Sequence, residues 1–437
     1  GQSFVLTLIL LGILFLFYGR ILQSSGQAFL ALTLFLTSGG LGWWYFVLDW
    51  MKNPTLETLK FPPQEYTHIG SEVIEWINVV TAQLVPQRAF LLGLPIMLAI
   101  LLLLLRYSEQ GWSVERWKIV LLGILSGLML IIHAHSFIVL VLICSFWMMM
   151  DRKKSPWLLF ALSAAFPSAV LYSLFYGQSV EQGFLSWYPG WLAHPLSKNV
   201  NWFWFWIWNW GIFLPFALIA SFKTGLYRHP LVASGIVLFL VSNLVLFQPY
   251  DWDNSKILTW SYLLLCLPAA RGLVCLWSKK NLMKVIVIGL FFTMTASGFL
   301  DLWRLLQTDQ LALQMWSKEE IELARQFRSI SNPTDRVLTS DQHNHWVSTL
   351  TGHPVMLGYK GWMWTYGIDY TSVDADMQTM FAGRESSKEL LLQYNIKYVI
   401  IGPSERSSYN ANEEFFERSY RNVLESDSYR VYEVASP

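Results

Sequence analysis

Apolar stretches recur along the chain as far as residue 300, and each is about as long as a helix that crosses a lipid bilayer. Crossing the hydrocarbon core takes roughly 20 apolar residues in a helix, and fewer where flanking side chains reach back to the interface. The pattern therefore predicts an α-helical membrane domain, 1–304, with about ten transmembrane helices. They are expected at 4–18, 26–48, 89–105, 119–133, 136–150, 157–176, 202–222, 230–247, 257–276 and 283–300.

The apolar run 119–150 is interrupted by one short polar sequence, His133-Ala134-His135-Ser136. As a single helix the run would be about 48 Å long, whereas the hydrocarbon core is about 30 Å thick. We therefore expect two helices that turn back on each other at this sequence.

Residues 305–437 differ in character, because amphipathic helices alternate there with short strands. A helix is expected at 318–329 with Ser317 as its cap, and another at 387–394 leads into a strand. This alternation predicts a small soluble α/β domain, 305–437, after the membrane domain. Its strands are expected at 337–339, 355–357, 398–401 and 431–434.

The composition supports a chain that is solvated largely by lipid. Hydrophobic residues make up 54% of the chain and charged residues 14%, whereas soluble domains carry about 25% charged residues. The net charge of +1 gives no indication of a nucleic-acid partner. Cys144, Cys266 and Cys275 lie in apolar runs, so we expect neither a disulfide framework nor a cysteine metal site.

Lys and Arg gather in one set of predicted loops, and such loops face the cytoplasm. The other loops, the N-terminus and the C-terminal domain are then extracytoplasmic, in an integral protein of the plasma (inner) membrane. The chain begins at Gly1 inside an apolar stretch with no Met, so we expect the natural N-terminus to lie upstream. The basic loops are 19–27, 106–118, 151–156, 223–229 and 277–284.

Four polar residues, Asp251, Asp253, Asn254 and Lys256, stand at the predicted outer entrance to the helix 257–276. Charged groups next to lipid are costly unless they are paired or used. A carboxylate here can serve as a base or a metal ligand, and Lys256 can neutralise a phosphate. Equally, Asp253, Asn254 or Ser255 can cap the helix while Lys256 reaches toward the interface.

Two further polar pairs are expected on the same side. His133 and His135 do not share a helix face, so a turn is needed for both to converge. They can bind a metal, hydrogen-bond a phosphate or relay protons, or they can simply close a helical hairpin. Gln87 and Arg88 precede the helix 89–105, where Arg88 can grip a phosphate or anchor the helix among lipid headgroups.

The C-terminal domain carries Trp362 and Trp364 between glycines. Such rings can stack on sugar faces, or they can rest against the membrane domain. His343, His345 and His353 lie nearby in sequence, but their spacing matches no known zinc pattern, so no metal site is predicted.

Several local phrases occur in an order that resembles the polytopic membrane glycosyltransferases of the GT-C superfamily, in particular mannosyltransferase-like proteins of bacteria and archaea. The resemblance implies inverting transfer of a sugar from a polyprenyl-phosphate carrier to an outward-facing acceptor. In that superfamily an acidic residue of the first outer loop is the base, and this loop would lie upstream of Gly1. The resemblance therefore does not assign Asp251 or Asp253. The phrases are GGLGWW (39–44), VPQRAFLLGLP (85–95), GLMLIIHAHSF (127–137), QPYDWDNSKIL (248–258), LTGHPVMLGYKGWMWTYGIDY (350–370) and LLQYNIKYVIIGPSER (391–406).

The sequence thus predicts a membrane glycosyltransferase with Asp251 and Asp253 as candidate catalytic carboxylates. No cofactor is expected, and a divalent cation is left open. The expected partners are the bilayer, a polyprenyl-phosphate-sugar donor, and a glycan, lipid or protein acceptor. The candidate substrate contacts are Gln87, Arg88, His133, His135, Asn254, Lys256, Trp362 and Trp364. Of the polar candidates, Arg88, His133, His135 and the segment 251–256 are expected to line one outward-opening cavity beneath the soluble domain.

Two other functions are open at this point. A secondary transporter would place ionisable groups near the midplane and show repeat symmetry. A non-catalytic membrane scaffold would use the outer domain to bind partners, and its polar motifs would only cap helices.

Overall fold

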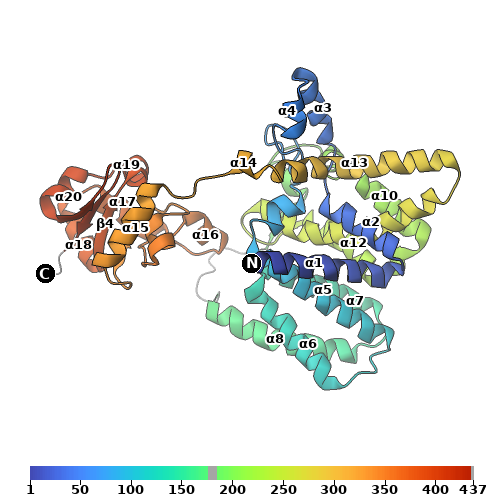
Figure 1. The fold of residues 1–437 in the computed structure, drawn as a ribbon. Helices are drawn as coiled ribbons and strands as arrows, with labels where there is room; N and C mark the ends of the chain where they lie inside the picture. Colours follow the sequence, from blue (N-terminus) through green and yellow to red (C-terminus); the bar gives the residue numbers. More distant parts are fainter. Residues whose placement is uncertain (176–184, 435–437) are drawn as a thin grey trace. The chain divides into compact units, whose positions relative to one another are not determined.

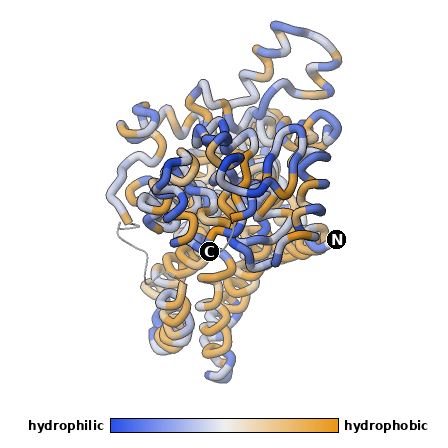
Figure 2. The backbone as a smooth tube through the Cα atoms, turned by 90° about the vertical axis from the view of Figure 1, so that its left-hand side faces the viewer, coloured by the Kyte–Doolittle hydropathy of each residue, from blue (hydrophilic) through white to orange (hydrophobic). Residues whose placement is uncertain are grey.

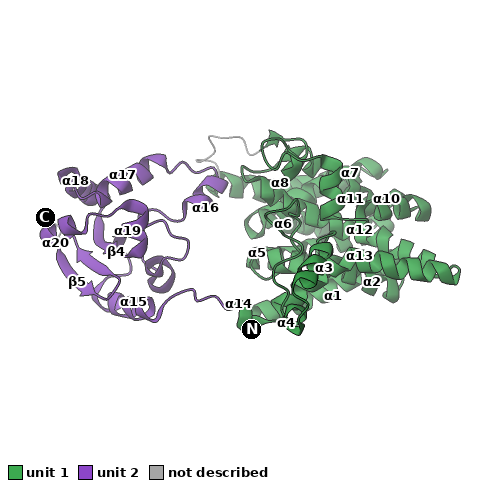
Figure 3. Cartoon of the chain, turned by 90° about the horizontal axis from the view of Figure 1, so that it is seen from above, with its two compact units in different colours: residues 1–178, 184–311 green, residues 179–183, 312–437 purple. Residues whose placement is uncertain are grey.

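The structure is a computed structural model that describes residues 1–175 and 185–434. It divides into two compact units, one formed by the residues up to Leu311 and the other beginning at Ala312 (Figure 3). The first unit is a bundle of helices, and the second combines helices with a small sheet.

Five helices of the first unit are long and apolar enough to cross a membrane. They make the chain an integral membrane protein, as its composition predicts. Figure 2 shows this apolar character along the backbone. The lowest pair of helices in that view is α8 and its neighbour α6 (Arg116–Ile132), and both are orange along most of their length. The five long helices are α1 (Gln2–Leu22), α5 (Arg88–Glu109), α8 (Ser155–Phe175), α12 (Ser255–Trp277) and α13 (Asn281–Leu305).

The remaining apolar helices of the described residues are shorter, so the expected number of about ten spans is not confirmed. The bent pair α9 and α10, with 89° between its helices, would raise the number of spans from five to six. The shorter helices are α2 (Ser25–Leu36), α7 (Ala134–Met150), α9 (Trp202–Asn209), α10 (Phe213–Thr224) and α11 (Pro230–Ser242).

The single helix expected at 26–48 is wrong, because the chain breaks after α2 and resumes as α3 (Trp43–Lys52). Glycines at the break let it approach neighbouring backbone closely. A Cβ on Gly40 would lie 1.9 Å from the Trp208 carbonyl oxygen, and one on Gly42 would lie 1.7 Å from that of Tyr66. A continuous helix would lose these contacts.

Two other expected spans are also interrupted. The helix expected at 202–222 bends between α9 and α10, where Gly211 has a φ of 59°. The helix expected at 230–247 ends with α11 at Ser242, and the chain then forms strand β2 (Val245–Leu246), which pairs with β1 (Ser186–Trp187).

Helix α12 is the centre of the first unit (Figure 1). Most of its side chains are buried, and it packs against α1, α2, α7, α10, α11 and α13. Two hydrogen bonds tie it to its neighbours: the Tyr18 hydroxyl donates to the Leu263 carbonyl at 3.0 Å, and the Ser261 hydroxyl donates to the Gly235 carbonyl at 2.7 Å. The beginning of α12 is therefore held in a fixed position.

Helices α6 and α8 pack closely through Gly123 and Gly127, which lie on one face of α6. A Cβ on Gly127 would lie 2.3 Å from the Ala164 carbonyl oxygen, and one on Gly123 would lie 2.6 Å from that of Phe160. Small residues four apart allow this approach between membrane helices.

The two helices expected on either side of the HAHS sequence are confirmed as α6 and α7. His133 interrupts the helical backbone between them with φ of −159° and ψ of 99°. The pair therefore turns at the predicted residue.

The second unit has a four-stranded sheet in the order β3-β4-β6-β5, in which β3 is parallel to β4 and the other neighbours are antiparallel. The helix after Ser317 is confirmed, with a capping box between Ser317 and Glu320. The strand expected at 355–357 is wrong, since only Val355 forms a bridge. The strands are β3 (Arg336–Leu338), β4 (Ile396–Ile401), β5 (Arg421–Glu425) and β6 (Arg430–Glu433), and the longer helices are α15 (Lys318–Ile330), α17 (Thr371–Phe381) and α18 (Glu385–Gln393).

Short helical segments complete both units. They are α4 (Leu56–Lys60), η1 (Val80–Leu84), η2 (Trp191–Ala193), η3 (Leu226–Arg228), η4 (Asp251–Asn254), α14 (Thr308–Leu311), η5 (Val347–Thr351), α16 (Lys360–Thr365), α19 (Pro403–Tyr409) and α20 (Glu413–Ser419).

Candidate functional site

A cluster of polar side chains lies where η4 leads into α12. Its centre is the Asp253 carboxylate, whose Oδ2 lies 2.9 Å from the Lys256 ammonium and 4.0 Å from Nε2 of His135. The Gln248 amide donates a hydrogen bond to the same oxygen. The side chains of Asp253 and Lys256 are each only 14% exposed. The structure thus brings together residues from two of the motifs that the sequence singles out.

His133 and His135 have different surroundings within this cluster. His133 is the N-cap of α7, and its Nδ1 accepts a hydrogen bond from the Ser136 backbone N–H at 3.1 Å. Its ring packs edge-on against Phe90, with 5.1 Å between centroids. The rings of the two histidines lie 5.6 Å apart. His133 therefore shapes the turn, while His135 is the one next to Asp253.

Asn254 is buried and its amide is occupied by backbone groups. The amide donates to the carbonyls of Ser242 and Val245, at 2.9 and 2.7 Å, and its oxygen accepts from the Phe247 N–H. Asn254 holds the chain between α11 and α12 in place. The side-chain cap that the sequence allows for α12 is not formed by Asn254.

The other candidates of the first unit lie near this cluster in the fold without joining its hydrogen bonds. The carbonyl of Asp251 accepts a hydrogen bond from the Trp191 indole at 2.8 Å. Arg88 is the first residue of α5, two positions before Phe90, and it is exposed. It forms neither a hydrogen bond nor an ion pair with the residues that the structure describes. The Gln87 amide donates to the Ala82 carbonyl at 3.2 Å.

Trp362 and Trp364 belong to α16 of the second unit and are 51% and 44% exposed. Lys360 anchors this helix through Asp374, at 3.0 Å, and Asp341, at 3.5 Å. Trp362 packs against His343, with ring centroids 4.6 Å apart. The common cavity that the sequence predicts would involve both units and stays a prediction.

The histidines near α16 in the sequence have different partners in the structure. Nε2 of His345 lies 3.2 Å from the Glu405 carboxylate, and both side chains are buried. Burial raises the pKa of Glu405, but its hydrogen bonds from His345 and from the Ser340 backbone outweigh burial, so the pKa is lowered overall. Nδ1 of His353 instead pairs with the Thr351 hydroxyl at 2.7 Å. Among the described residues, no three His, Cys, Asp or Glu side chains are grouped to hold a metal.

Another buried carboxylate of the first unit, which the sequence analysis does not select, lies in the loop between α4 and α5. Glu75 is 4% exposed, and its carboxylate lies 2.5 Å from the Lys198 ammonium and 3.4 Å from Nδ1 of His68. Its backbone N–H donates to the Asn209 amide oxygen at 2.7 Å. Glu75 is visible in the sequence as one of several loop acids, but no local pattern links it to Lys198.

No protein-family model matches the sequence, and no curated protein matches it. Solved structures do resemble it. The oligosaccharyltransferase from Archaeoglobus fulgidus, tethered with an acceptor peptide, aligns with a TM-score of 0.50 and 10% identity, over 96% of this chain and 61% of that one. The arabinofuranosyltransferase AftD from Mycobacteria aligns with a TM-score of 0.54 and 14% identity, over 98% of this chain and 33% of that one. A mutant of AftD gives 0.56 and 14%, over 100% and 35%.

Both of these enzymes are GT-C glycosyltransferases. The chain therefore has a GT-C-like fold: an integral membrane bundle followed by a small unit that contains a sheet. The likeness is one of fold, since identity is 14% or less. The chain spans less than two thirds of the oligosaccharyltransferase and about a third of AftD.

Proposed function

We propose that this chain is a membrane glycosyltransferase that takes a sugar from a polyprenyl-phosphate donor and passes it to an acceptor outside the cytoplasm. The observation that carries the proposal is the contact of Asp253 with Lys256 and His135 at one end of a bundle with a GT-C-like fold. A carboxylate, an ammonium and an imidazole are the groups that such a transfer needs in one place.

In the proposed reaction one bond forms and one bond breaks at C1 of the sugar. The nucleophilic atom of the acceptor attacks C1 of the sugar on the face opposite the phosphate. The bond from C1 to the phosphate oxygen breaks, and its electron pair leaves with the polyprenyl phosphate. The acceptor proton passes to the Asp253 carboxylate, which acts as general base. The configuration at C1 is inverted as a result.

Binding of the donor would draw Lys256 away from Asp253, and this carboxylate could then act as the base. Without donor the Lys256 ammonium is paired with Asp253 at 2.9 Å. The phosphodiester of the donor carries one negative charge, and the charge on its phosphate grows toward two as the C1–O bond breaks. This growing charge attracts the ammonium, since Lys acts as a compact point charge on a flexible stem. Transfer of Lys256 to the phosphate stabilises the leaving group and frees Asp253 to accept a proton. His135 and Arg88 are then further donors to the phosphate.

The acceptor can be a glycan, a lipid or a protein, and Trp362 and Trp364 are proposed to contact its sugar or its apolar part. A divalent cation would find two protein ligands in Asp253 and His135. It would have to draw the rest of its ligands from donor phosphate and water.

The topology belongs to the same proposal. Ten passes are obtained if α1, α2, α5, α6, α7, α8, the α9–α10 pair, α11, α12 and α13 each cross the plasma membrane once. The loops that follow α5, α7, α10 and α12 carry most of the Lys and Arg and would be cytoplasmic. The Asp253 cluster and the domain that follows residue 304 would then both be extracytoplasmic.

The test is sugar transfer from a panel of polyprenyl-phosphate sugars by the full-length protein in liposomes. Asp253→Asn keeps the size of the side chain and removes the base, so we expect a fall in kcat of about 10²- to 10⁴-fold. Asp309→Asn, at an exposed site in α14, is the matched control and should leave transfer unchanged. Full activity of Asp253→Asn, or no turnover of any donor by the unaltered protein, would contradict the proposal.

A further inference from the structure

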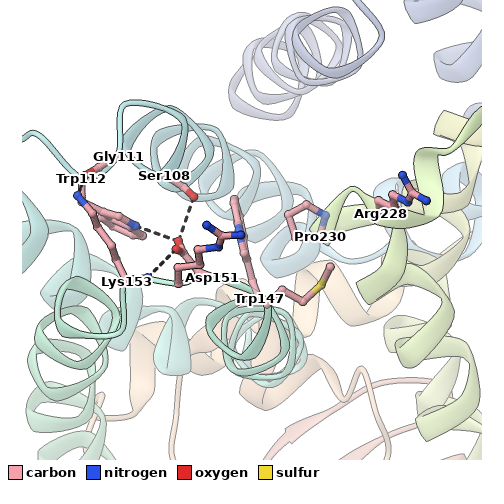
Figure 4. Close-up of a pocket in the computed structure, with 10 residues that line it drawn as sticks. Ser108, Gly111, Trp112, Trp147, Asp151, Lys153, Arg228 and Pro230 are labelled. Atoms are coloured by element: carbon pink, nitrogen blue, oxygen red, sulfur yellow. Dashed lines mark hydrogen bonds between the residues drawn. The ribbon is translucent and has the colours of Figure 1, made fainter.

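A pocket of about 440 Å³ is lined by residues around the ends of α5 and α7 and the beginning of α11 (Figure 4). It lies at the end of the first unit away from the Asp253 cluster. Helix α5 connects the two places: Phe90 packs against His133 near its beginning, and Ser108 lines the pocket near its end. Roughly 27 Å of helix separates these two residues at 1.5 Å per residue. The pocket is therefore distinct from the site proposed for sugar transfer.

One wall of the pocket is organised by Asp151, at the end of α7. Its Oδ2 accepts hydrogen bonds from the indoles of Trp112, at 2.9 Å, and Trp157, at 3.0 Å, and from the Ser108 hydroxyl, at 3.1 Å. Its Oδ1 accepts from the Lys153 backbone N–H at 3.0 Å. All four of these hydrogen-bond donors to the carboxylate are neutral groups. Asp151 fastens the loops after α5 and α7 to the start of α8, and within the described residues it forms no ion pair with a cation.

Three cations line the same pocket: Arg152 and Lys153 on the Asp151 side, and Arg228 on the side of α11. Figure 4 shows Arg228 across the pocket from Asp151. The Lys153 ammonium donates to the Gly111 carbonyl at 2.7 Å, and Nε of Arg228 donates to the Tyr227 hydroxyl at 2.9 Å. Within residues 1–175 and 185–434 none of the three cations forms an ion pair with a carboxylate. Their unused N–H groups can therefore take an anion.

The rest of the lining fits a lipid. Trp147 and Met150 give the pocket an apolar side next to the cations. Trp147 and Trp112 pack on Trp157, with ring centroids 5.2 and 5.0 Å apart, and Trp rings gather where a membrane meets water. Pro230 is the first residue of α11, so the positive end of that helix dipole also faces the pocket.

We propose that this pocket binds the phosphate headgroup of an anionic phospholipid from the surrounding bilayer. Arg152 and Arg228 grip the phosphate from two sides, Lys153 adds a third positive charge, and the first part of an acyl chain lies against Trp147 and Met150. Basic pockets between membrane helices favour anionic lipids for these reasons. The inference does not depend on the glycosyltransferase proposal, because it uses none of the same residues.

The test is lipid retention by the purified full chain, measured by native mass spectrometry during titration with phosphatidylglycerol or phosphatidylcholine. We expect phosphatidylglycerol to bind more tightly. Each cation near a membrane surface contributes roughly a fivefold change in affinity, so the pair R152Q and R228Q should weaken phosphatidylglycerol binding by about 25-fold. The pair K279Q and K280Q removes the same charge outside the pocket and is the matched control.

Three results would overturn the inference. They are unchanged phosphatidylglycerol binding by the R152Q and R228Q pair, an equal loss in the control pair, and equal retention of phosphatidylcholine. Inorganic phosphate that displaces the lipid at micromolar concentration would show a site for the free anion instead. Because both arginines are exposed, the variants should keep the unfolding midpoint of the original protein, and R152K with R228K should restore most of the binding.

Discussion

Single residues show how the same side-chain type takes different roles in this protein. Both His133 and His135 come from one short sequence, yet one caps a helix and the other faces a carboxylate. Asn254 lies between two charged candidates in the sequence, yet its amide donates hydrogen bonds to backbone carbonyls. The role of each side chain depends on whether its polar atoms already form hydrogen bonds with other groups of the protein.

Glu405 leads to a prediction about pH. Its pKa in the folded chain is below its ordinary value, so the carboxylate contributes stability fully above that ordinary value. This contribution is lost as pH falls through the lowered pKa. The unfolding midpoint of the second unit, followed in the full chain by scanning calorimetry, should therefore drop between about pH 4.5 and the lowered pKa.

The variant Glu405→Gln should remove this part of the acid sensitivity and lower the midpoint at pH 7. Loss of one partner from a buried hydrogen-bonded pair costs about 1–3 kcal/mol. Glu389→Gln changes an exposed carboxylate of α18 and should alter neither property. An unchanged acid profile of Glu405→Gln would show that another group causes the loss of stability.

At the scale of elements, close glycine contacts decide how the membrane helices fit together. The approach of α6 to α8 leaves no room for a Cβ on Gly127, because the nearest atom belongs to backbone. The break between α2 and α3 depends on the same kind of contact. Helix positions in this unit are thus set by backbone packing as well as by apolar side chains.

We expect Gly127→Ala to push α8 away from α6 and to destabilise the protein by about 1–3 kcal/mol, the usual cost of overpacking. The measurement is the thermal unfolding midpoint in detergent. Gly289→Ala is the matched control, since a Cβ there would meet no atom within 4 Å. A midpoint that falls equally in both variants would mean that helix packing at Gly127 is not the cause.

At the scale of the whole molecule, the two ends of the bundle carry different chemistry. One end holds the buried Asp253 cluster, and the other holds the pocket lined by Arg152, Lys153 and Arg228. The uneven distribution of Lys and Arg predicts that the first end faces outward, as the proposed topology requires. This assignment can be tested directly.

The test uses the C275S variant with one cysteine added, either at Ser329 or at Lys279. Labelling of the added cysteine shows on which side of the membrane it lies. A membrane-impermeant maleimide applied to intact cells should label Ser329→Cys at once, and Lys279→Cys only after the membrane is permeabilised. Cys144 and Cys266 are buried and should not react. The reverse labelling pattern would contradict the proposed orientation.

Features that depend on residues close together along the chain could be predicted from the sequence. The apolar runs predict the five long helices, because a spanning helix needs only a continuous hydrophobic stretch. The break at His133 and the helix cap at Ser317 follow from local hydrogen bonding. The local phrases also indicate the superfamily whose fold the solved structures confirm.

Contacts between residues far apart along the chain, by contrast, depend on the tertiary fold. The 26–48 run is apolar throughout much of its length, but contacts with Trp208 and Tyr66 break it. Likewise, His135 reaches Asp253 only through the packing of α7 on α12. Such contacts join residues far apart along the chain, so no periodicity or spacing encodes them. The polar clusters at the two ends of the bundle were for this reason visible in the sequence only as separate charges.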